Sequence, residues 1–146
     1  MKKLFPLIAA FGLLLTAGTS IANDYYGKQK VVYHINSADD KLLNAALGNI
    51  GNHISAVGKE NVDMQVVMHG DGVDLLKKAN KDPDLQSKVI NLKNQGVKMR
   101  VCAITLKKKN IDYKGELFDV AKEDIVPSGV AELARLQSQG YQYVKP

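Results

Sequence analysis

The chain has few of the residues that most often reveal a function. It holds one cysteine, Cys102, and no tryptophan among its 146 residues. A single cysteine cannot form a disulfide within its own chain, and it excludes c-type haem attachment and zinc sites built from several cysteines. Aromatic residues make up only 6% of the chain, so we expect a core of aliphatic side chains and methionine.

Several motifs of known chemistry are also missing. The three histidines are scattered: His34 lies in a predicted strand and His53 in a predicted helix, and no pair with His69 has the spacing typical of metal ligands. The sequence has no GxxxxGK[ST] phosphate-binding loop, no nucleophile elbow and no obvious pair of catalytic carboxylates. We therefore expect no metal and no cofactor.

The first residues resemble a secretory signal peptide. Lys2 and Lys3 precede the apolar stretch from Leu4 to Ala17, and Ser20-Ile21-Ala22 offers a cleavage site before Asn23. An uncleaved membrane anchor is the alternative, but the apolar stretch is shorter than the roughly 20 residues of a spanning helix. We expect the segment to be removed, which leaves a periplasmic protein without a membrane contact.

The predicted mature chain suits one domain of mildly basic charge. Without residues 1–22 it has 124 residues, a common size for a single domain. Lys and Arg fall from 20 to 18 while Asp and Glu stay at 15, so the net charge falls from +5 to +3. A small anionic ligand is compatible with this charge. Export, and the lack of a basic patch interleaved with aromatics, argue against nucleic acid as a partner.

Strand-like and helix-like segments alternate along the domain, which we assign to residues 30–146 after a polar lead-in at 23–29. Predicted strands cover 30–35, 62–68, 97–103, 125–127 and 141–144. Predicted helices run between Ser37 and Gly58, over 73–79, from Pro83 to Gly96 and from Ser128 to Gly140. For 106–120 we expect a loop and one short helix. This alternation predicts a three-layer α/β/α sandwich with a mainly parallel sheet of about five strands.

In such sheets, ligands bind outside the carboxyl ends of the strands. Four segments follow predicted strands: Asn36 with Ser37, His69 to Gly72, Cys102 to Thr105, and Pro127 to Gly129. We expect these four segments to line any active site.

Three of the motifs resemble one known family. They are the runs Val67-Met68-His69-Gly70-Asp71-Gly72-Val73-Asp74-Leu75-Leu76, Gly96 to Cys102 followed by Thr105-Leu106, and Val126 to Tyr141. In their order and spacing they resemble the DsrE/DsrF-like superfamily. The resemblance implies a homotrimer or homohexamer of small α/β/α domains. It also implies that a cysteine in this region carries sulfur as a persulfide between partners, and only Cys102 matches that position.

Cys102 has two interpretations. As a sulfurtransferase-like carrier, its thiolate would take sulfur from a donor and pass it to an acceptor, either a protein or a small thiol. Strand alternation places Lys98 and Arg100 on the same side, where their charges would stabilise the thiolate. Alternatively, Cys102 is a small core residue, since free cysteine is often buried. The protein would then be a non-catalytic oligomeric module that assembles or binds a small anion.

The other predicted pocket residues also have structural alternatives. His69 could donate a proton or promote the thiolate, or it could hydrogen-bond the turn that Gly70 and Gly72 permit. That turn could present its amides to an anion. We place Thr105 in the pocket because it follows the cysteine strand closely. Asn36, together with Ser37, could contact a ligand or cap the following helix.

The basic run Lys107-Lys108-Lys109 follows the cysteine strand. It is most simply a solvated loop. It could also attract anionic sulfur species or an acidic partner.

Overall fold

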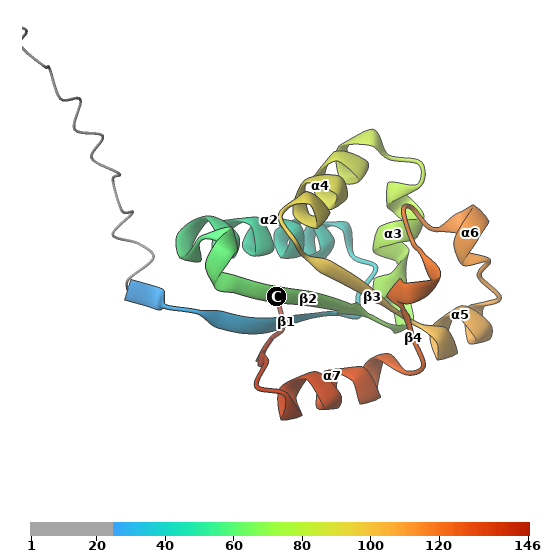
Figure 1. Ribbon diagram of the computed structural model, residues 1–146. Helices are drawn as coiled ribbons and strands as arrows, with labels where there is room; N and C mark the ends of the chain where they lie inside the picture. The colour runs from blue at the N-terminus through green and yellow to red at the C-terminus, as the bar shows by residue number, and fades with distance from the viewer. Residues whose placement is uncertain (1–24) are drawn as a thin grey trace, which may run out of the picture.

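The computed structural model describes residues 25–146, so the predicted signal peptide lies outside the described residues (Figure 1). Five strands form one sheet in the order β4-β3-β2-β1-β5, and every neighbouring pair is parallel. The strands are β1 (Gln29–Ile35), β2 (Val62–Met68), β3 (Lys98–Cys102), β4 (Ile125–Val126) and β5 (Gln142–Val144). Because all five run in the same direction, their carboxyl ends lie at one edge of the sheet.

The helices cover both faces of this sheet and make a three-layer α/β/α sandwich, as the sequence predicts. They are α2 (Asp40–Val57), α3 (Asp74–Ala79), α4 (Pro83–Asn94), α5 (Ala103–Lys109), α6 (Tyr113–Glu116) and α7 (Gly129–Ser138). Helices α2, α3 and α4 lie on one face of the sheet and α7 on the other. Helices α5 and α6 lie toward the edge formed by the carboxyl ends of the strands (Figure 1). Within residues 25–146, no helix is long and apolar enough to cross a membrane.

Two aliphatic clusters hold the layers together. The larger cluster packs the odd-numbered residues of β1, such as Val31 and Tyr33, against α2, α3 and α4. The smaller one packs Val32 and Val67 against Leu133 and Leu136 of α7. Both faces of the central strands are therefore buried near α7, which is typical of a parallel sheet.

The first helix begins later than the sequence suggests. Gly58 ends α2 with a φ of 89°, as expected, but the N-cap is Asp39, whose side chain accepts a hydrogen bond of 2.9 Å from the Leu42 amide. Ser37 instead accepts a hydrogen bond of 3.1 Å from the Asp39 amide. The prediction of Ser37 as the cap was wrong, because two capping residue types stand close together here and aspartate is as good a cap as serine.

The segment after Cys102 is helical rather than a loop. Helix α5 begins at Ala103, directly after β3, and it ends at Asn110, which has a left-handed φ of 51°. The run Lys107-Lys108-Lys109 therefore forms the last turn of a helix, where cations are favourable. The short helix α6 follows within the same stretch.

The remaining short helices are 3-10 turns next to the strands. They are η1 (Lys59–Asn61), η2 (Gly70–Val73) and η3 (Lys122–Asp124). Of these, η2 joins the carboxyl end of β2 to α3 and contains the Gly-Asp-Gly motif, so it places that motif at the carboxyl edge of the sheet.

Candidate functional site

Three of the four predicted strand-end segments meet at Gly129, the first residue of α7. A Cβ atom added at Gly129 would lie 2.8 Å from the Cβ of His69 and 3.2 Å from the Cβ of Cys102. Those two Cβ atoms are therefore no more than about 6 Å apart, since both lie that close to one point. Only a glycine allows α7 to begin so close to both side chains.

The Gly-Asp-Gly turn brings the ends of β1 and β2 together. Gly70 has a left-handed φ of 56°, which favours glycine. A Cβ atom at Gly72 would lie 2.0 Å from the carbonyl oxygen of Ile35, so no side chain fits there. The amide of Gly70 donates a hydrogen bond of 2.9 Å to the Thr105 hydroxyl oxygen, which connects the turn to α5. The two glycines thus have a structural role that explains their presence.

The Cys102 thiol is buried but held in a setting that favours its charged form. Only 5% of the residue is exposed. Burial raises the pKa of the thiol, but hydrogen bonds to the sulfur outweigh burial and lower the pKa below its ordinary value. The donors are the Thr105 hydroxyl and the backbone N–H groups of Gly129, Thr105 and Ile104. A thiolate is the nucleophilic form of cysteine, so this environment favours reactivity.

Thr105 orients the thiol environment. Its hydroxyl oxygen accepts a hydrogen bond of 2.9 Å from the Gly70 amide, and hydrogen bonding from the Thr105 side chain lowers the pKa of the Cys102 thiol. A hydroxyl has one hydrogen to donate, so accepting from the amide leaves that hydrogen free for the sulfur. Thr105, which the sequence predicts in the pocket, is thus the one side chain whose hydrogen bonding lowers the pKa of Cys102.

A chain of hydrogen bonds runs from His69 to the edge of the sheet. His69 Nε2 is 2.7 Å from His34 Nε2, and His34 Nδ1 is 2.6 Å from the Tyr143 hydroxyl. Burial, His69 and the positive charge of Lys145 lower the pKa of His34 to about 4. Burial and Lys145 also lower the pKa of His69. Both rings are therefore neutral near pH 7.

His34 and Tyr143 were missed by the sequence analysis. His34 lies in β1 and Tyr143 in β5, and the two strands are 109 positions apart in sequence at this contact. Strand alternation places His34 on the same face as Val32, but only the strand order shows that β1 lies between β2 and β5. The one indication in the sequence that His34 belongs to the site was a histidine on a strand face that otherwise carries valine.

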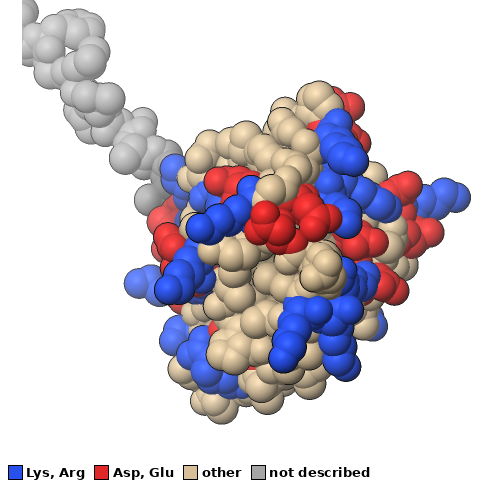
Figure 2. Space-filling view, turned by 90° about the vertical axis from the view of Figure 1, so that its right-hand side faces the viewer, with Lys and Arg blue, Asp and Glu red and all other residues tan. Residues whose placement is uncertain are grey.

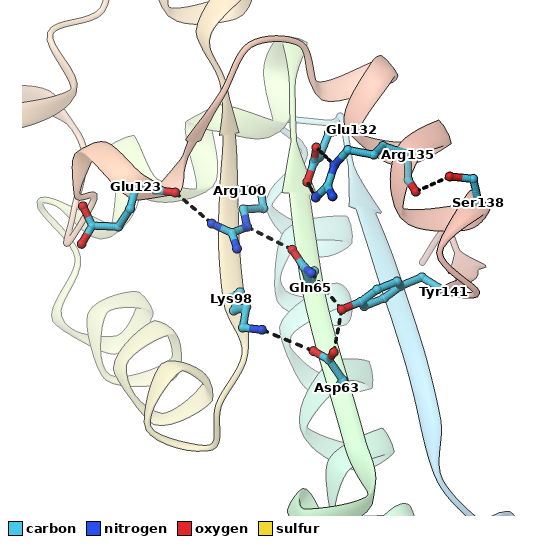
Figure 3. A network of polar contacts seen from close by, with 9 residues as sticks. All are labelled: Asp63, Gln65, Lys98, Arg100, Glu123, Glu132, Arg135, Ser138 and Tyr141. Carbon is cyan, nitrogen blue, oxygen red and sulfur yellow. Dashed lines mark hydrogen bonds and ion pairs between the residues drawn. The ribbon is translucent and has the colours of Figure 1, made fainter.

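Lys98 and Arg100 lie on the predicted face but interact elsewhere (Figure 3). Lys98 Nζ is 3.6 Å from an oxygen of Asp63. Arg100 donates from Nε to Gln65 at 3.0 Å and from Nη1 to the carbonyl oxygen of Glu123 at 2.8 Å. Neither cation is among the groups that shift the Cys102 pKa. Their role is to connect the sheet and the η3 turn, which differs from the predicted stabilisation of the thiolate.

Asn36 and Ser37 line a cavity apart from the thiol. The cavity has a volume of about 200 Å³ and is also lined by His34, Lys145 and apolar residues of α2. It lies at the carboxyl end of β1, next to β5, where the strand order changes direction. Such switch points are common ligand sites in parallel sheets.

The charges at the carboxyl edge are mixed. Figure 2 faces this side of the molecule and shows both basic and acidic side chains on it. Lys109 is paired with Asp71 at 2.7 Å and with Asp74 at 3.6 Å, so its charge is locally balanced. Within the described part of the chain, no group of three or more histidine, cysteine or acidic residues is placed to hold a metal ion.

Comparisons with known proteins agree with this architecture. The chain is similar to a solved structure described as a protein of unknown function, MTH1491, from Methanobacterium thermoautotrophicum, with 29% identity and a TM-score of 0.71. The match covers 82% of this chain and 100% of that one. A comparison with curated proteins gave no match. The model of the DsrE/DsrF-like family matches residues 30–146, nearly all of the described chain, and the protein therefore belongs to the DsrE/DsrF-like family.

Proposed function

We propose that this protein carries sulfur on Cys102, as a persulfide, between a donor and an acceptor. The observation that carries the proposal is the place of Cys102 at the end of β3 beside Gly129, where hydrogen bonding from Thr105 and nearby backbone groups lowers the pKa of a buried thiol. Burial without such donors would hold the thiol in its neutral, unreactive form. Membership of the DsrE/DsrF-like family supports a role related to sulfur relay.

The proposed chemistry needs no cofactor. The Cys102 thiolate attacks the outer sulfur of a donor persulfide, R–S–SH, forming a new S–S bond while the donor S–S bond breaks and R–S⁻ leaves. In the second step an acceptor thiolate attacks the outer sulfur of the Cys102 persulfide. Cys102 then leaves as a thiolate, and the same hydrogen bonds that favoured the thiolate as nucleophile make it a good leaving group.

The proposal includes the setting of the reaction. We place the mature protein in the periplasm, after removal of residues 1–22, as a homotrimer or homohexamer. The donor and acceptor would be exported proteins or small thiols, and the proposal includes neither nucleic acid nor membrane as a partner.

Intact-mass spectrometry tests the carrier. Reduced, folded protein is exposed to polysulfide or thiosulfate, with Cys102→Ser as the matched control. We expect a gain of one sulfur atom that reductant reverses and that the variant lacks. The absence of an adduct on the folded protein, together with labelling of Cys102 only after denaturation, would contradict the proposal.

A second candidate is a non-catalytic binding or assembly module. Two observations favour it: the Cys102 residue is only 5% exposed, and the cavity of about 200 Å³ lies beside β1 rather than at the thiol. In this case Cys102→Ser would leave binding of a small anion unchanged, because the ligand would contact Asn36, Ser37 and Lys145 instead.

A further inference from the structure

The contacts of His34 form a continuous hydrogen-bonded chain that joins β5, β1 and the residue after β2. His34, which is 8% exposed, bonds through one ring nitrogen to His69 Nε2 at 2.7 Å and through the other to the Tyr143 hydroxyl at 2.6 Å. The two rings are inclined by only 23°, with centroids 4.7 Å apart. A neutral histidine has one N–H donor and one acceptor nitrogen. Both partners of His34 can donate or accept, so the direction of each hydrogen bond can reverse.

Two neutral arrangements satisfy this chain equally well. In the first, the Tyr143 hydroxyl donates to His34 Nδ1, His34 Nε2–H donates to His69 Nε2, and His69 Nδ1 carries a hydrogen. In the second, every bond is reversed, and His69 Nδ1 has a free lone pair. Switching between them moves one proton along the whole chain without charging either ring.

The two ends of the chain lie in different surroundings. At the inner end, His69 Cγ, the atom bonded to Nδ1, would lie 3.3 Å from a Cβ at Gly129, next to Cys102. At the outer end, Tyr143 is 43% exposed on the edge strand β5, where water can supply or remove a proton. The chain therefore connects the thiol site with solvent.

The charged groups around the chain leave it neutral. Lys145 follows β5, Arg100 and Cys102 lie on β3, Asp71 follows β2, and Glu132 and Arg135 lie on α7. Asp71 is paired with Lys109, and both oxygens of Glu132 accept hydrogen bonds from Arg135, at 2.6 and 2.8 Å. Lys145 alone acts on the pKa of both rings and lowers both, which keeps a proton from being trapped on the chain.

We propose that Tyr143, His34 and His69 form a proton relay that delivers a proton from solvent to the sulfur that leaves when Cys102 is loaded. Cys102–S⁻ and R–S–SH give Cys102–S–SH and R–S⁻, His69 Nδ1–H protonates R–S⁻, and the proton is replaced through His34 from Tyr143 and water. No oxidant or reductant is consumed. The inference deepens the proposed function and rests on it.

Exchange with small disulfides separates a relay from a purely structural contact. Cys102–S⁻ attacks R–S–S–R, giving Cys102–S–S–R and R–S⁻. With 2-hydroxyethyl disulfide the leaving group is an alkyl thiolate with an ordinary pKa of about 8.5 or above, which needs a proton. With 4,4′-dithiodipyridine the leaving group is stable without one. A proton relay therefore affects the first reagent and not the second.

Two variants interrupt the chain and one serves as control. His34→Gln keeps hydrogen-bonding atoms but cannot pass a proton on, and Tyr143→Phe removes only a partly exposed hydroxyl. The matched control is His53→Gln, since His53 also bonds to a tyrosine, Tyr33, at 3.0 Å and to Gln29 at 2.7 Å. Thermal unfolding of each variant shows whether it is folded. If His34→Gln does not fold, Tyr143→Phe alone tests the relay.

We expect both chain variants to react with 2-hydroxyethyl disulfide at least about 100-fold more slowly, because general acid catalysis contributes about 10²–10⁴-fold. We expect less than a two-fold change with 4,4′-dithiodipyridine, and none with either reagent in His53→Gln. Equal slowing with both reagents, or slowing with neither, would overturn the proposed proton relay. The proposal that Cys102 carries sulfur would be unaffected. A wild-type thiol that reacts with neither reagent would instead overturn the carrier, and the relay with it.

Discussion

At the scale of single residues, the competition between burial and hydrogen bonding decides the chemistry of Cys102. Burial disfavours a thiolate, whereas four hydrogen bonds to the sulfur favour it, and the second effect is larger. The Thr105 hydroxyl is the one side-chain donor among them. It is therefore the contact that mutation can remove most cleanly.

Thr105→Val should raise the pKa of the Cys102 thiol. A hydrogen bond to the charged sulfur favours the thiolate, so its loss should raise the pKa and lower the fraction of reactive thiolate at neutral pH. The pH dependence of alkylation by iodoacetamide measures it. Thr105→Ser keeps the hydroxyl and should behave as wild type. An unchanged pH profile in Thr105→Val would show that the hydroxyl does not stabilise the thiolate.

Gly129→Ala should destabilise the protein because the new Cβ would lie 2.8 Å from the Cβ of His69. Overpacking of this kind costs about 1–3 kcal/mol in the free energy of unfolding, which urea denaturation measures. The matched control is Gly48→Ala in α2, where an added Cβ meets nothing within 4 Å. That control should be stabilised by up to about 1 kcal/mol. A neutral effect at Gly129 would contradict the close approach of α7.

At the scale of elements, parallel pairing of β1 and β2 creates the histidine pair. The register pairs Ile35 with Met68, and the ladder continues with a hydrogen bond of 3.3 Å from the His69 amide to the Ile35 carbonyl oxygen. Two histidines that are unrelated in sequence thereby become neighbours at the strand ends. Because His34 is buried and both rings are neutral, the pair makes the stability of the sheet depend on pH.

Stability should fall as the pH falls from about 6.5 to 4. The pKa of His34 is about 4 in the folded protein, below its ordinary value of 6.5, so the unfolded chain binds more protons in this window. The loss due to His34 is at most about 3.5 kcal/mol, since one pKa unit corresponds to about 1.4 kcal/mol, and it is complete below pH 4. His34→Gln should show a smaller slope of unfolding free energy against pH. The same slope in both proteins would contradict this assignment.

At the scale of the whole molecule, helix α7 covers part of one face of the sheet and leaves part of it at the surface (Figure 3). Helix α7 packs on β1 and β2 near their carboxyl ends, and charged side chains of β2 and β3, including Asp63 and Lys98, remain at the surface beside it (Figure 3). The start of α7 also supplies Gly129 to the thiol site. The arrangement that completes the core therefore also completes the candidate site.

The proposed export of the chain has a direct test. If the first 22 residues are a signal peptide, expression in a bacterium should yield a periplasmic protein that begins at Asn23. Cell fractionation followed by intact-mass measurement checks both statements. A full-length chain, retained in the cytoplasm or the membrane, would contradict them.

Much of the architecture could be predicted from local patterns. Strand β2 has the predicted bounds, and Gly58 and Ser128 end and begin helices as expected. These features depend on alternation of apolar residues and on capping chemistry, which act over a few residues. The stretch after Cys102 was harder to predict, because α5 is seven residues long and its last turn is all lysine.

The sequence by itself determined the alternating α/β pattern, the lone cysteine at a strand end and the turn that needs Gly70 and Gly72. Only the tertiary structure decided which strand ends adjoin, and hence that His69, Cys102 and Gly129 meet and that His34 connects His69 to Tyr143. The physical reason is that backbone propensities and hydrophobic periodicity are local. The neighbours of a side chain depend instead on strand order, which is established when the sheet forms across distant parts of the chain.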